Sequence, residues 1–367
     1  MALGAFPSQY IRRLIEEGAV IGASQTNIQP SSLDLTLSEE AWRMPGIFLP
    51  RPGETIHDII KTGGGEPWDL SKPLPLRGIF FVRLRESLKL PSTVIFAYAN
   101  NKSSTGRINL QTRLICDGVS QFDKVPRGYA GELWLVISPR SFNIQMHPGA
   151  ALNQLRFFNS DTRLNYTDHL ALYEYFNLLW NPDHTPISRD EVHFDLHGGI
   201  TMSVNLDQDV IGYSATQNPN VTLDISRSDH DPHDFFRPLH RPENGRLMLL
   251  RDEFYILSTI EQIAVPPEFS VEMVAYDPSK GEFRSHYAGF FDPGFGFGEK
   301  GEVKGTTAVL EVYPHDNDFF LRHGQPICKM VYERLATFPE LVYGTGNLKS
   351  NYQKQSGPRL SKYFKSA

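Results

Sequence analysis

The stretch ESLKLP, at residues 86–91, decides the fold prediction, because a related stretch, EQIAVP, occurs at residues 261–266, 175 residues later. The pairs Gly106/Gly281 and Gly149/Gly324 have the same separation. One offset that holds over about 60 residues without a gap indicates an internal duplication, and its period is too long for a solenoid repeat. The sequence therefore predicts two tandem copies of one domain.

Short runs rich in β-branched and aromatic residues predict that both copies consist mainly of strands. The runs are GIFFVRL (78–84), TVIFAYA (93–99), ELWLVIS (132–138), RLMLL (246–250) and TAVLEVY (307–313). Two stretches favour helix instead. Residues 8–17 have Ser8 as a candidate N-cap and Gly18 as a stop, and residues 167–180 end before Asn181-Pro182. We expect a mainly β chain with a few short helices.

The duplication also predicts the domain organisation. We expect a first β domain at residues 1–165 and a helical connector at residues 166–189. The second β domain then covers residues 190–338, and a polar tail covers residues 339–367.

Composition and charge exclude several classes of protein. Of the 367 residues, 40% are hydrophobic and 21% are charged, which is typical of a packed globular chain. The net charge of −6 argues against a general nucleic-acid binder, and two cysteines, Cys116 and Cys328, cannot form a disulfide framework. The N-terminus lacks a signal-peptide pattern, and no run approaches the ~18–20 apolar residues of a membrane span. We expect a cytoplasmic protein without membrane or nucleic-acid partners.

Six motifs carry a family resemblance through their order along the chain. They are IQPSSLDL (28–35), LPSTVIFAYANNKSSTGR (90–107) and HPGAALNQLRFF (147–158) in the first copy, AGFFDPGFG (288–296) and VLEVY (309–313) in the second, and NYQKQSG (351–357) in the tail. In this order they resemble the dCTP deaminase/dUTPase superfamily, in particular its dCTP deaminase branch. The resemblance implies that each copy is a dUTPase-like distorted β-barrel of jelly-roll-like type.

The segment KSSTGR, residues 102–107, has two interpretations. Hydroxyl-bearing residues and glycine suit an ordinary turn. The alternative is an anion cradle, in which main-chain N–H groups and hydroxyls surround a phosphate while cations neutralise it. The resemblance favours the cradle and implies that Lys102, Ser104 and Arg107 hold the triphosphate or organise the pocket, while Ser103 helps to position water. Lys102 stands where the family has arginine, so its contact should be less directional.

The second copy has no equivalent of this cradle. At the same offset it reads DPSKGE (277–282), which lacks the paired serines and sets Glu282 opposite Arg107. Because carboxylates repel a triphosphate, we expect no phosphate site in the second copy.

Glu311 interrupts an apolar run in the second copy, and its counterpart in the first copy is Val136. A glutamate in such a strand is costly unless it is exposed or paired, so one interpretation is the solvent face of a half-buried strand. The resemblance instead implies that Glu311 is the catalytic carboxylate. The copies would then have lost complementary halves of one site. We expect one site per chain, formed by a first and a second copy; whether both belong to the same chain is open.

The resemblance also implies further substrate-binding positions. These are Ala288, Asp292, Phe295, Val309 and Leu310 near the base and sugar, and Tyr343, Tyr352, Lys354 and Gln355, with Lys349 less securely matched, in a C-terminal lid. The alternative for the tail is a disordered terminus. The glycine-rich residues 295–305 suit either a mobile flap or an ordinary long hairpin loop.

Metal chemistry is not expected at a protein site. The cluster SDHDPHDFF (228–236) suits a polar surface loop better than a metal site. The zinc deaminase motifs H-x-E and P-C-x-x-C do not occur, and neither does a P-loop motif. We expect Mg²⁺ only as the companion of a nucleotide triphosphate, and no catalytic zinc.

The resemblance implies hydrolytic deamination of dCTP to dUTP and ammonia, with Glu311 as general base and then general acid. Three alternatives remain open: a bifunctional enzyme that forms dUMP and pyrophosphate, a pure dUTPase, and a non-catalytic nucleotide-binding module. The resemblance further implies a homo-oligomer and dTTP as a possible inhibitor.

Overall fold

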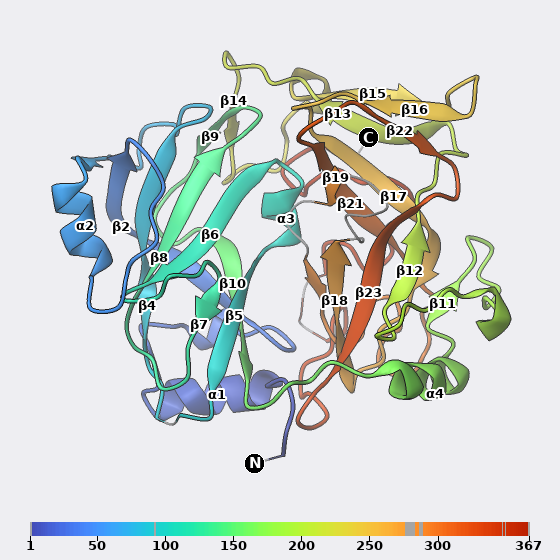
Figure 1. Cartoon of the computed structure of the whole chain (residues 1–367), viewed down its shortest axis with the longest axis horizontal. Helices are drawn as coiled ribbons and strands as arrows, with labels where there is room; N and C mark the ends of the chain where they lie inside the picture. Colours follow the sequence, from blue (N-terminus) through green and yellow to red (C-terminus); the bar gives the residue numbers. More distant parts are fainter. Residues whose placement is uncertain are drawn as a thin grey trace. The chain divides into compact units, whose positions relative to one another are not determined.

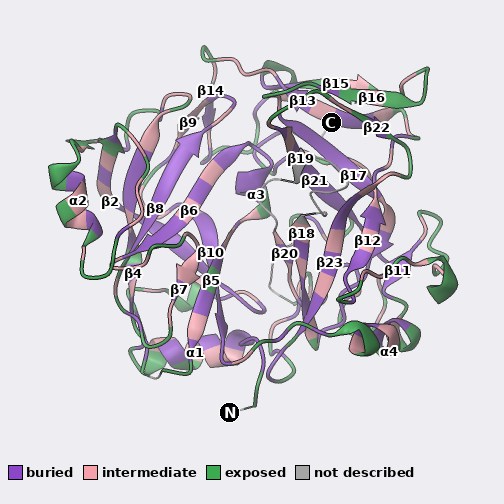
Figure 2. Cartoon of the chain, in the orientation of Figure 1, coloured by how far each residue is buried: buried purple, intermediate pink, exposed green. Residues whose placement is uncertain are grey.

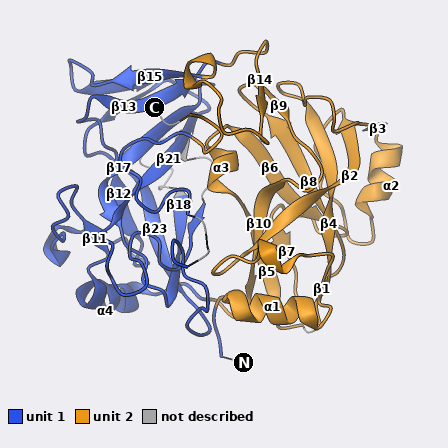
Figure 3. Cartoon of the chain, turned by 180° about the vertical axis from the view of Figure 1, so that it is seen from behind, with its two compact units in different colours: residues 1–4, 162–216, 236–360 blue, residues 5–161, 217–235, 361–367 orange. Residues whose placement is uncertain are grey.

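The computed structural model (Figure 1) describes residues 2–91, 93–275, 283–285, 289–346, 348 and 350–365. The chain divides into two compact units (Figure 3). We call residues 5–161, 217–235 and 361–367 the N-terminal unit, and residues 1–4, 162–216 and 236–360 the C-terminal unit. Residues 217–235 thus come from the middle of the second copy in sequence but cluster with the unit built mainly from the first copy.

The N-terminal unit contains three α-helices and two short 3₁₀-helices among its described residues, and otherwise strands and loops. Its elements are α1 (Ser8–Glu16), β1 (Val20–Ile21), η1 (Gln25–Asn27), β2 (Leu33–Met44), α2 (Ile56–Thr62), β3 (Glu66–Pro67), β4 (Ile79–Lys89), β5 (Phe96–Asn101), α3 (Ser103–Gly106), β6 (Leu110–Cys116), β7 (Lys124–Val125), β8 (Ala130–Pro139), β9 (Asn143–Gln145) and β10 (Ala151–Phe158). From the second copy it adds β14 (Thr222–Asp224) and the 3₁₀-helix η3 (Pro232–Asp234).

The C-terminal unit is also built mainly from strands. Its elements are α4 (Tyr166–Phe176), β11 (Leu179–Trp180), η2 (Arg189–Glu191), β12 (Ile200–Ser203), β13 (Val210–Ala215), β15 (Phe236–His240), β16 (Arg246–Leu249), β17 (Tyr255–Ile263), β18 (Phe269–Ala275), β19 (Phe283–Ser285), β20 (Phe290–Phe291), β21 (Thr306–Pro314), β22 (Phe319–Arg322) and β23 (Pro326–Arg334). None of the helices among the described residues has the length and hydropathy needed to cross a membrane.

Strand pairing confirms the predicted duplication. In the N-terminal unit the sheet has the order β6-β8-β4-β2-β10-β5-β7, and in the C-terminal unit the sheets run β15-β13-β17-β21-β19 and β12-β23-β18-β20. The β4·β8 pair aligns Phe81 with Val136, and the β17·β21 pair aligns Ile256 with Glu311. All four positions obey the offset of 175, and both pairs contain an irregularity at the same place, after Arg83 and after Ser258. The two copies therefore share one strand register.

The turns at Gly149 and Gly324, which are separated by the same 175 residues, also match. The N–H of Gly149 donates to the carbonyl of Leu37 over 2.8 Å, and the N–H of Gly324 donates to the carbonyl of Val204 over 3.0 Å. Both glycines have positive φ, +85° and +75°, a region that favours residues without a Cβ. The glycines are thus explained by the backbone of one turn that occurs twice.

In each copy, one glutamate side chain accepts a hydrogen bond from the main chain of a neighbouring strand. Glu86 on β4 accepts from the main-chain N of Thr36 over 2.8 Å, and Glu261 on β17 accepts from that of Ser203 over 2.8 Å. The hydroxyl of Thr36 adds a second bond of 2.6 Å to Glu86. Burial raises the pKa of both carboxyl groups, and the hydrogen bonds oppose this shift.

These carboxylates should make stability depend on pH. Because a raised folded-state pKa favours the protonated form, their stabilising contribution is complete below the ordinary glutamate pKa of 4.5 and falls as pH rises through the raised value. We expect Glu86→Gln and Glu261→Gln each to reduce the fall in the free energy of unfolding between pH 4.5 and the raised pKa. Urea titrations at several pH values measure this fall. The exposed Glu243→Gln is the control, and an unchanged slope in both test variants would contradict the assignment.

All five predicted strands are confirmed as β4, β5, β8, β16 and β21, although β5 begins at Phe96 rather than at residue 93. The two predicted helices exist with different ends. Ser8 is the first helical residue of α1, and its N-cap is Pro7, which makes no side-chain cap bond. Helix α4 begins after Asn165, whose side chain accepts from the N–H of Asp168, and it ends at Asn177 in the left-handed region (φ +50°). Residues 179–180 are therefore a strand, not the helix end that we predicted.

Several strands, among them β10 and β21, are buried over nearly their whole length (Figure 2). In the C-terminal unit one apolar cluster joins β12, β17, β21 and β23, and it includes Leu257, Ala308, Leu310, Val312 and Met330. In the N-terminal unit a cluster of seven buried residues brings α2 together with β2, β4, β6 and β8. Helix α2 of this cluster is not one of the two helices predicted from the sequence.

Candidate active site

The segment KSSTGR forms one helical turn in the N-terminal unit. Lys102 is the N-cap of α3 and Arg107 its C-cap, so the segment is a short helix rather than the open turn of one interpretation. Ser103 is exposed and Lys102 half-buried, whereas Ser104 and Arg107 are buried, at 5% and 4% exposure. Ser103 is therefore the most accessible of the four predicted ligand-binding side chains.

Lys102 has a partner within its own unit. Its Nζ forms an ion pair and hydrogen bond with Oδ2 of Asp34, a residue of the IQPSSLDL motif. The pair is largely buried, with 23% of the Lys102 side chain and 11% of the Asp34 side chain exposed. The Nε2 of Gln29 lies 3.4 Å from the same carboxylate oxygen. This geometry favours a role for Lys102 in holding α3 against β2.

The end of the chain supports the same loop, which the sequence did not reveal. The hydroxyl of Ser361 donates to the main-chain oxygen of Ser104 over 2.8 Å. Three residues further on, Phe364 packs edge-to-face with Phe235 at 5.5 Å and with His230 at 6.4 Å between ring centroids. No periodicity or motif in residues 358–367 indicated this contact.

The cluster at residues 228–236 is less polar than predicted. His230 is buried, with its Nε2 2.9 Å from the carbonyl oxygen of Asp224, and Phe235 and Phe236 are buried beside it. Ser228, the three aspartates and His233 are exposed, so the prediction of a polar surface loop holds for them and is wrong for His230, Phe235 and Phe236. Within the described ranges, no group of three or more His, Cys, Asp or Glu could hold a metal ion.

In the C-terminal unit, Glu311 lies on the face of β21 that points away from the core. Ala308, Leu310 and Val312 belong to the apolar core, so the alternating residues Val309 and Glu311 face the other side. Glu311 is only 6% exposed, so the alternative of a solvent-facing glutamate is wrong. The side chain of Leu310 is fully buried in the core, which leaves only its main chain for contact with a ligand.

The turn DPGF lies next to Tyr343, a second predicted substrate residue. The N–H of Tyr343 donates to the carbonyl of Pro293 over 2.8 Å, and its ring packs against Phe295 at 5.6 Å. Burial raises the pKa of Tyr343, and the nearby Asp292 carboxylate adds to this shift. The structure thus brings Asp292, Phe295 and Tyr343 together.

The glycine-rich residues after this turn form a closed loop. The N–H of Gly305 donates to the carbonyl of Gly296 over 2.9 Å, and that of Val303 donates to Phe297 over 3.0 Å. Gly296 has φ +64°, and a Cβ there would lie 2.0 Å from the carbonyl oxygen of Ile263, so only glycine fits. Residues 296–305 therefore form a loop whose two ends are joined by a main-chain hydrogen bond.

The C-terminal segment docks on this hairpin. The Gln353 side chain accepts from the N–H of Gly296 (3.2 Å) and donates to the carbonyl of Gly294 (2.9 Å). Nε2 of Gln355, itself 4% exposed, donates to the carbonyl of Thr307 over 2.7 Å. Tyr352 is buried in the core cluster. These contacts exclude a disordered terminus for residues 352–355, and a lid function of this segment stays a prediction.

A cavity of about 500 Å³ adjoins the docked segment. Lys354, Gln355 and Ser356 form one part of its lining, and His184, Lys304 and Thr306 form others. Nζ of Lys304 lies 5.0 Å from the ring centroid of Trp180, a cation–π contact. The cavity therefore offers cationic and amide groups within reach of the segment that we predicted to bind the substrate.

Gln353 should control the closure of this segment. We expect Gln353→Ala to remove two hydrogen bonds, each contributing about 1 kcal/mol, and so to accelerate amide exchange in residues 350–357 by about tenfold or more. Hydrogen–deuterium exchange followed by mass spectrometry measures this directly. Ser356→Ala, an exposed position of the same segment, is the control. Equal exchange in the two variants would show that Gln353 does not hold the segment.

Some predicted positions lie outside the described residues. Ala288 is one, Lys349 is another, and the DPSKGE segment of the second copy is a third. Two features of the site were not found from the sequence: the ion pair of Lys102 with Asp34, and the support of Ser104 by Ser361. Both join residues that are distant along the chain, so no local pattern could indicate them.

Comparison with known proteins agrees with this arrangement. The family model "2'-deoxycytidine 5'-triphosphate deaminase (DCD) N-terminal domain" matches residues 2–161, and the model for the C-terminal domain matches residues 179–364. A crystal structure of 2'-deoxycytidine 5'-triphosphate deaminase from Agrobacterium tumefaciens superposes with a TM-score of 0.82 at 37% sequence identity. The superposition covers 93% of this chain and all of that one.

Two curated relatives are both named "dCTP deaminase, dUMP-forming". The Methanobrevibacter smithii protein is 31% identical over 125 residues, and the Leifsonia xyli subsp. xyli protein is 29% identical over 115 residues. These matches cover 33% and 30% of this chain, and the chain spans only 59% and 53% of the length of those relatives. Because the two family models account for nearly all of the sequence, the chain belongs to the 2'-deoxycytidine 5'-triphosphate deaminase family.

Proposed function

We propose that this protein deaminates dCTP hydrolytically, with the nucleotide bound as its Mg²⁺ complex. Water adds to C4 of the cytosine ring, the bond from C4 to the exocyclic amino nitrogen breaks, and the products are the uracil nucleotide and ammonia. The proposal depends on the similarity of the whole chain to the family and on one observation, the buried carboxylate of Glu311 on the face of β21 opposite the apolar core.

Glu311 is suited to the proton transfers of this reaction. The attacking water must lose a proton, and the ring nitrogen and the leaving amine must gain protons, so one carboxylate can serve first as base and then as acid. Strand β21 is fixed by its pairing with β17, where Glu311 lies opposite Ile256. A carboxylate held on a paired strand is oriented before the substrate binds, which lowers the entropy cost of the reaction.

The remaining groups would bind and orient the nucleotide. Ser103 is the accessible hydroxyl of α3, and we assign it the positioning of water or of polar base atoms. We assign Asp292, Phe295 and Tyr343 to the sugar and base, and Gln355 and Lys354 to closure over the ligand. Lys102, Ser104 and Arg107 then organise the phosphate-binding loop, because each is partly or fully buried.

The final product distinguishes two forms of this function. Deamination alone yields dUTP, whereas further hydrolysis between the α- and β-phosphates yields dUMP and pyrophosphate. The names of the two curated relatives, both described as dUMP-forming, favour the second form. We therefore retain a bifunctional enzyme as the second candidate.

Product analysis tests the proposal. Incubation of the full chain with Mg²⁺ and dCTP should release one ammonia per dCTP consumed, with chromatography showing dUTP or else dUMP and pyrophosphate. Hydrolysis of dUTP without release of ammonia from dCTP would indicate a pure dUTPase. Nucleotide binding without any product would indicate a non-catalytic binding module, and either result would overturn the proposed deamination.

A further inference from the structure

The shared strand register identifies, in the first copy, the surface that corresponds to the Glu311 surface of the second. Because Phe81 faces Val136 and Ile256 faces Glu311, Val136 on β8 is the structural counterpart of Glu311. By the same register Trp134 corresponds to Val309. Residues that face each other across paired strands point to the same side of a sheet, so these positions define one equivalent face in each copy.

In the first copy this face is covered by α2. Ile56 and Ile60 of α2 are fully buried and pack in one cluster with Trp134, Val136 and Phe81. The cluster is apolar throughout, and its members fill the surface on which a ligand would otherwise lie against β8. The counterpart of the Glu311 face is therefore occupied by the chain itself.

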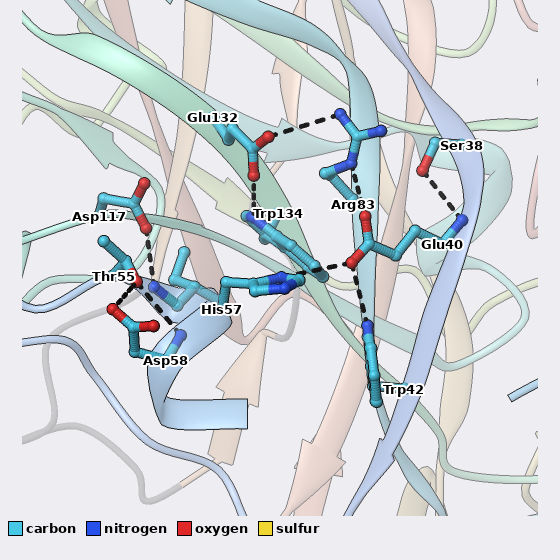
Figure 4. Close-up of polar contacts among 11 residues, drawn as sticks. Ser38, Glu40, Trp42, Thr55, His57, Asp58, Arg83, Asp117, Glu132 and Trp134 are labelled. Atoms are coloured by element: carbon cyan, nitrogen blue, oxygen red, sulfur yellow. Dashed lines mark hydrogen bonds and ion pairs between the residues drawn. The ribbon is translucent and has the colours of Figure 1, made fainter. Parts of the chain in front are cut away.

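Polar contacts at the start of α2 fix it in this position (Figure 4). The N–H of Ile56 donates to Oδ1 of Asp117 over 2.8 Å, and Thr55 caps the helix by accepting from the N–H of Asp58. His57 Nδ1 lies 3.4 Å from Oε1 of Glu40. The helix is thus bound to β2 and to the loop after β6, as well as to the apolar face.

An arginine on β4 contacts two glutamates beside α2. Glu40 accepts from Nε of Arg83 over 2.9 Å, and Arg83 lies 3.7 Å from Glu132. Indole Nε1 groups complete the arrangement: that of Trp42 donates to Glu40, and that of Trp134 donates to Glu132. Figure 4 shows these side chains around His57. The rim of the covered face is therefore closed by charged groups that satisfy one another.

The second copy uses the corresponding segment differently. Trp42 on β2 pairs with Pro67 on β3, and Tyr213 on β13 pairs with Pro238 on β15. Since Trp42 lies opposite Phe81 and Tyr213 lies opposite Ile256, the connection between β2 and β3 corresponds to the connection between β13 and β15. The first connection contains α2.

The second connection, residues 217–235, packs with elements of the N-terminal unit. Residues 217–235 belong to the N-terminal unit, where β14 pairs in parallel with β9 through Leu223 and Ile144. His230 and Phe235 of the same segment pack with Phe364 and Phe142. One connection therefore packs on the face of its own copy through α2, whereas its counterpart, residues 217–235, packs within the N-terminal unit.

We propose that α2 is a permanent plug, which fills in the first copy the position that a nucleobase takes in the second. The chain then binds one nucleotide, not two, although it contains two copies of the barrel. The identity of the ligand depends on the function proposed above, whereas the plug itself depends only on the packing of α2. At the position that corresponds to Glu311, this face carries Val136, whose side chain cannot transfer a proton.

Amide exchange tests the plug without any nucleotide. In the free full-length chain, residues 56–62 of α2 should exchange on the timescale of β8, and a saturating non-hydrolysable dCTP analogue should leave their exchange unchanged. Exchange of α2 within seconds, or a change of its rate on nucleotide binding, would overturn the proposal. A chain that neither binds nor deaminates dCTP would contradict the proposed function while leaving this measurement valid.

Two isoleucines of α2 provide a matched pair of variants. Ile60→Ala should accelerate exchange in α2 and β8 by at least about tenfold, because it opens a cavity under the plug, whereas Ile59→Ala, which lies on the partly exposed side, should have a much smaller effect. Neither substitution should change kcat/KM for dCTP by more than about twofold. An equal effect of the two variants on exchange, or a large effect of Ile60→Ala on turnover, would show that α2 is not a static plug.

Calorimetric titration gives the stoichiometry. With the non-hydrolysable analogue we expect one nucleotide per chain, and a value of two would overturn the inference. The variant Gln355→Ala tests the proposed site independently of α2. It should weaken the single binding event without revealing a second one. Residual binding with full affinity in that variant would indicate a site in the first copy.

Discussion

Glu311→Gln is expected to lower kcat for dCTP deamination by about 10²–10⁴-fold while nucleotide affinity stays within a few-fold. Glutamine has the same shape and still accepts hydrogen bonds, but it cannot take a proton from water or deliver one to the leaving amine. Because Glu311 is only 6% exposed, bulk water cannot easily replace it as the base. Steady-state release of ammonia measures kcat, and titration with a non-hydrolysable analogue measures binding.

The exposed Glu243→Gln is the matched control for this substitution, since it removes the same charge from the same unit. We expect it to leave both constants unchanged. Turnover by Glu311→Gln within about twofold of the original chain would exclude Glu311 as the proton-transfer group. Loss of affinity in parallel with turnover would instead indicate a binding role.

Lys102→Met is expected to lower the free energy of unfolding by about 3 kcal/mol. The substitution removes the cation but leaves Asp34, whose side chain is 11% exposed, as a largely buried and uncompensated carboxylate. Chemical unfolding at neutral pH measures the change. Ser103→Ala, at the exposed neighbouring position, should change stability by less than about 0.5 kcal/mol.

A double-mutant cycle separates the structural role of Lys102 from direct phosphate binding. Asp34→Asn combined with Lys102→Met removes both charges, so most of the lost stability should return. If Lys102 only organises the loop, KM for dCTP should return with it. A KM that stays raised in a stable double variant would show that Lys102 contacts the substrate directly.

The duplication and the main strands could be predicted from the sequence because they depend on local patterns. An offset of 175 between ESLKLP and EQIAVP appears again as an identical register of β4·β8 and β17·β21. Alternation within TAVLEVY is a property of any strand, so it already sets Leu310 and Glu311 on opposite faces. The helix ends were less predictable, because Asn177 terminates α4 through a backbone conformation that its neighbours alone do not specify.

The proposed site could be predicted only in part. The candidate residues of the lid and of the DPGF turn do lie together, since Tyr343 contacts both Pro293 and Phe295. The partner of Lys102 was not predicted, because Asp34 is 68 residues away and an ion pair leaves no local signature. The same reason applies to Ser361, which reaches Ser104 across 257 residues.

The sequence by itself determined that one β architecture occurs twice and that the two copies differ at Val136 and Glu311, because offsets, alternation and residue identity are properties of the linear chain. Only the tertiary structure decided that α2 covers the first face and that residues 217–235 pack in the N-terminal unit. The physical reason is that the stability of each connection depends on which apolar surface it can bury. That choice is made by packing between distant residues, Ile60 on Val136 in one case and Phe235 on Phe364 in the other.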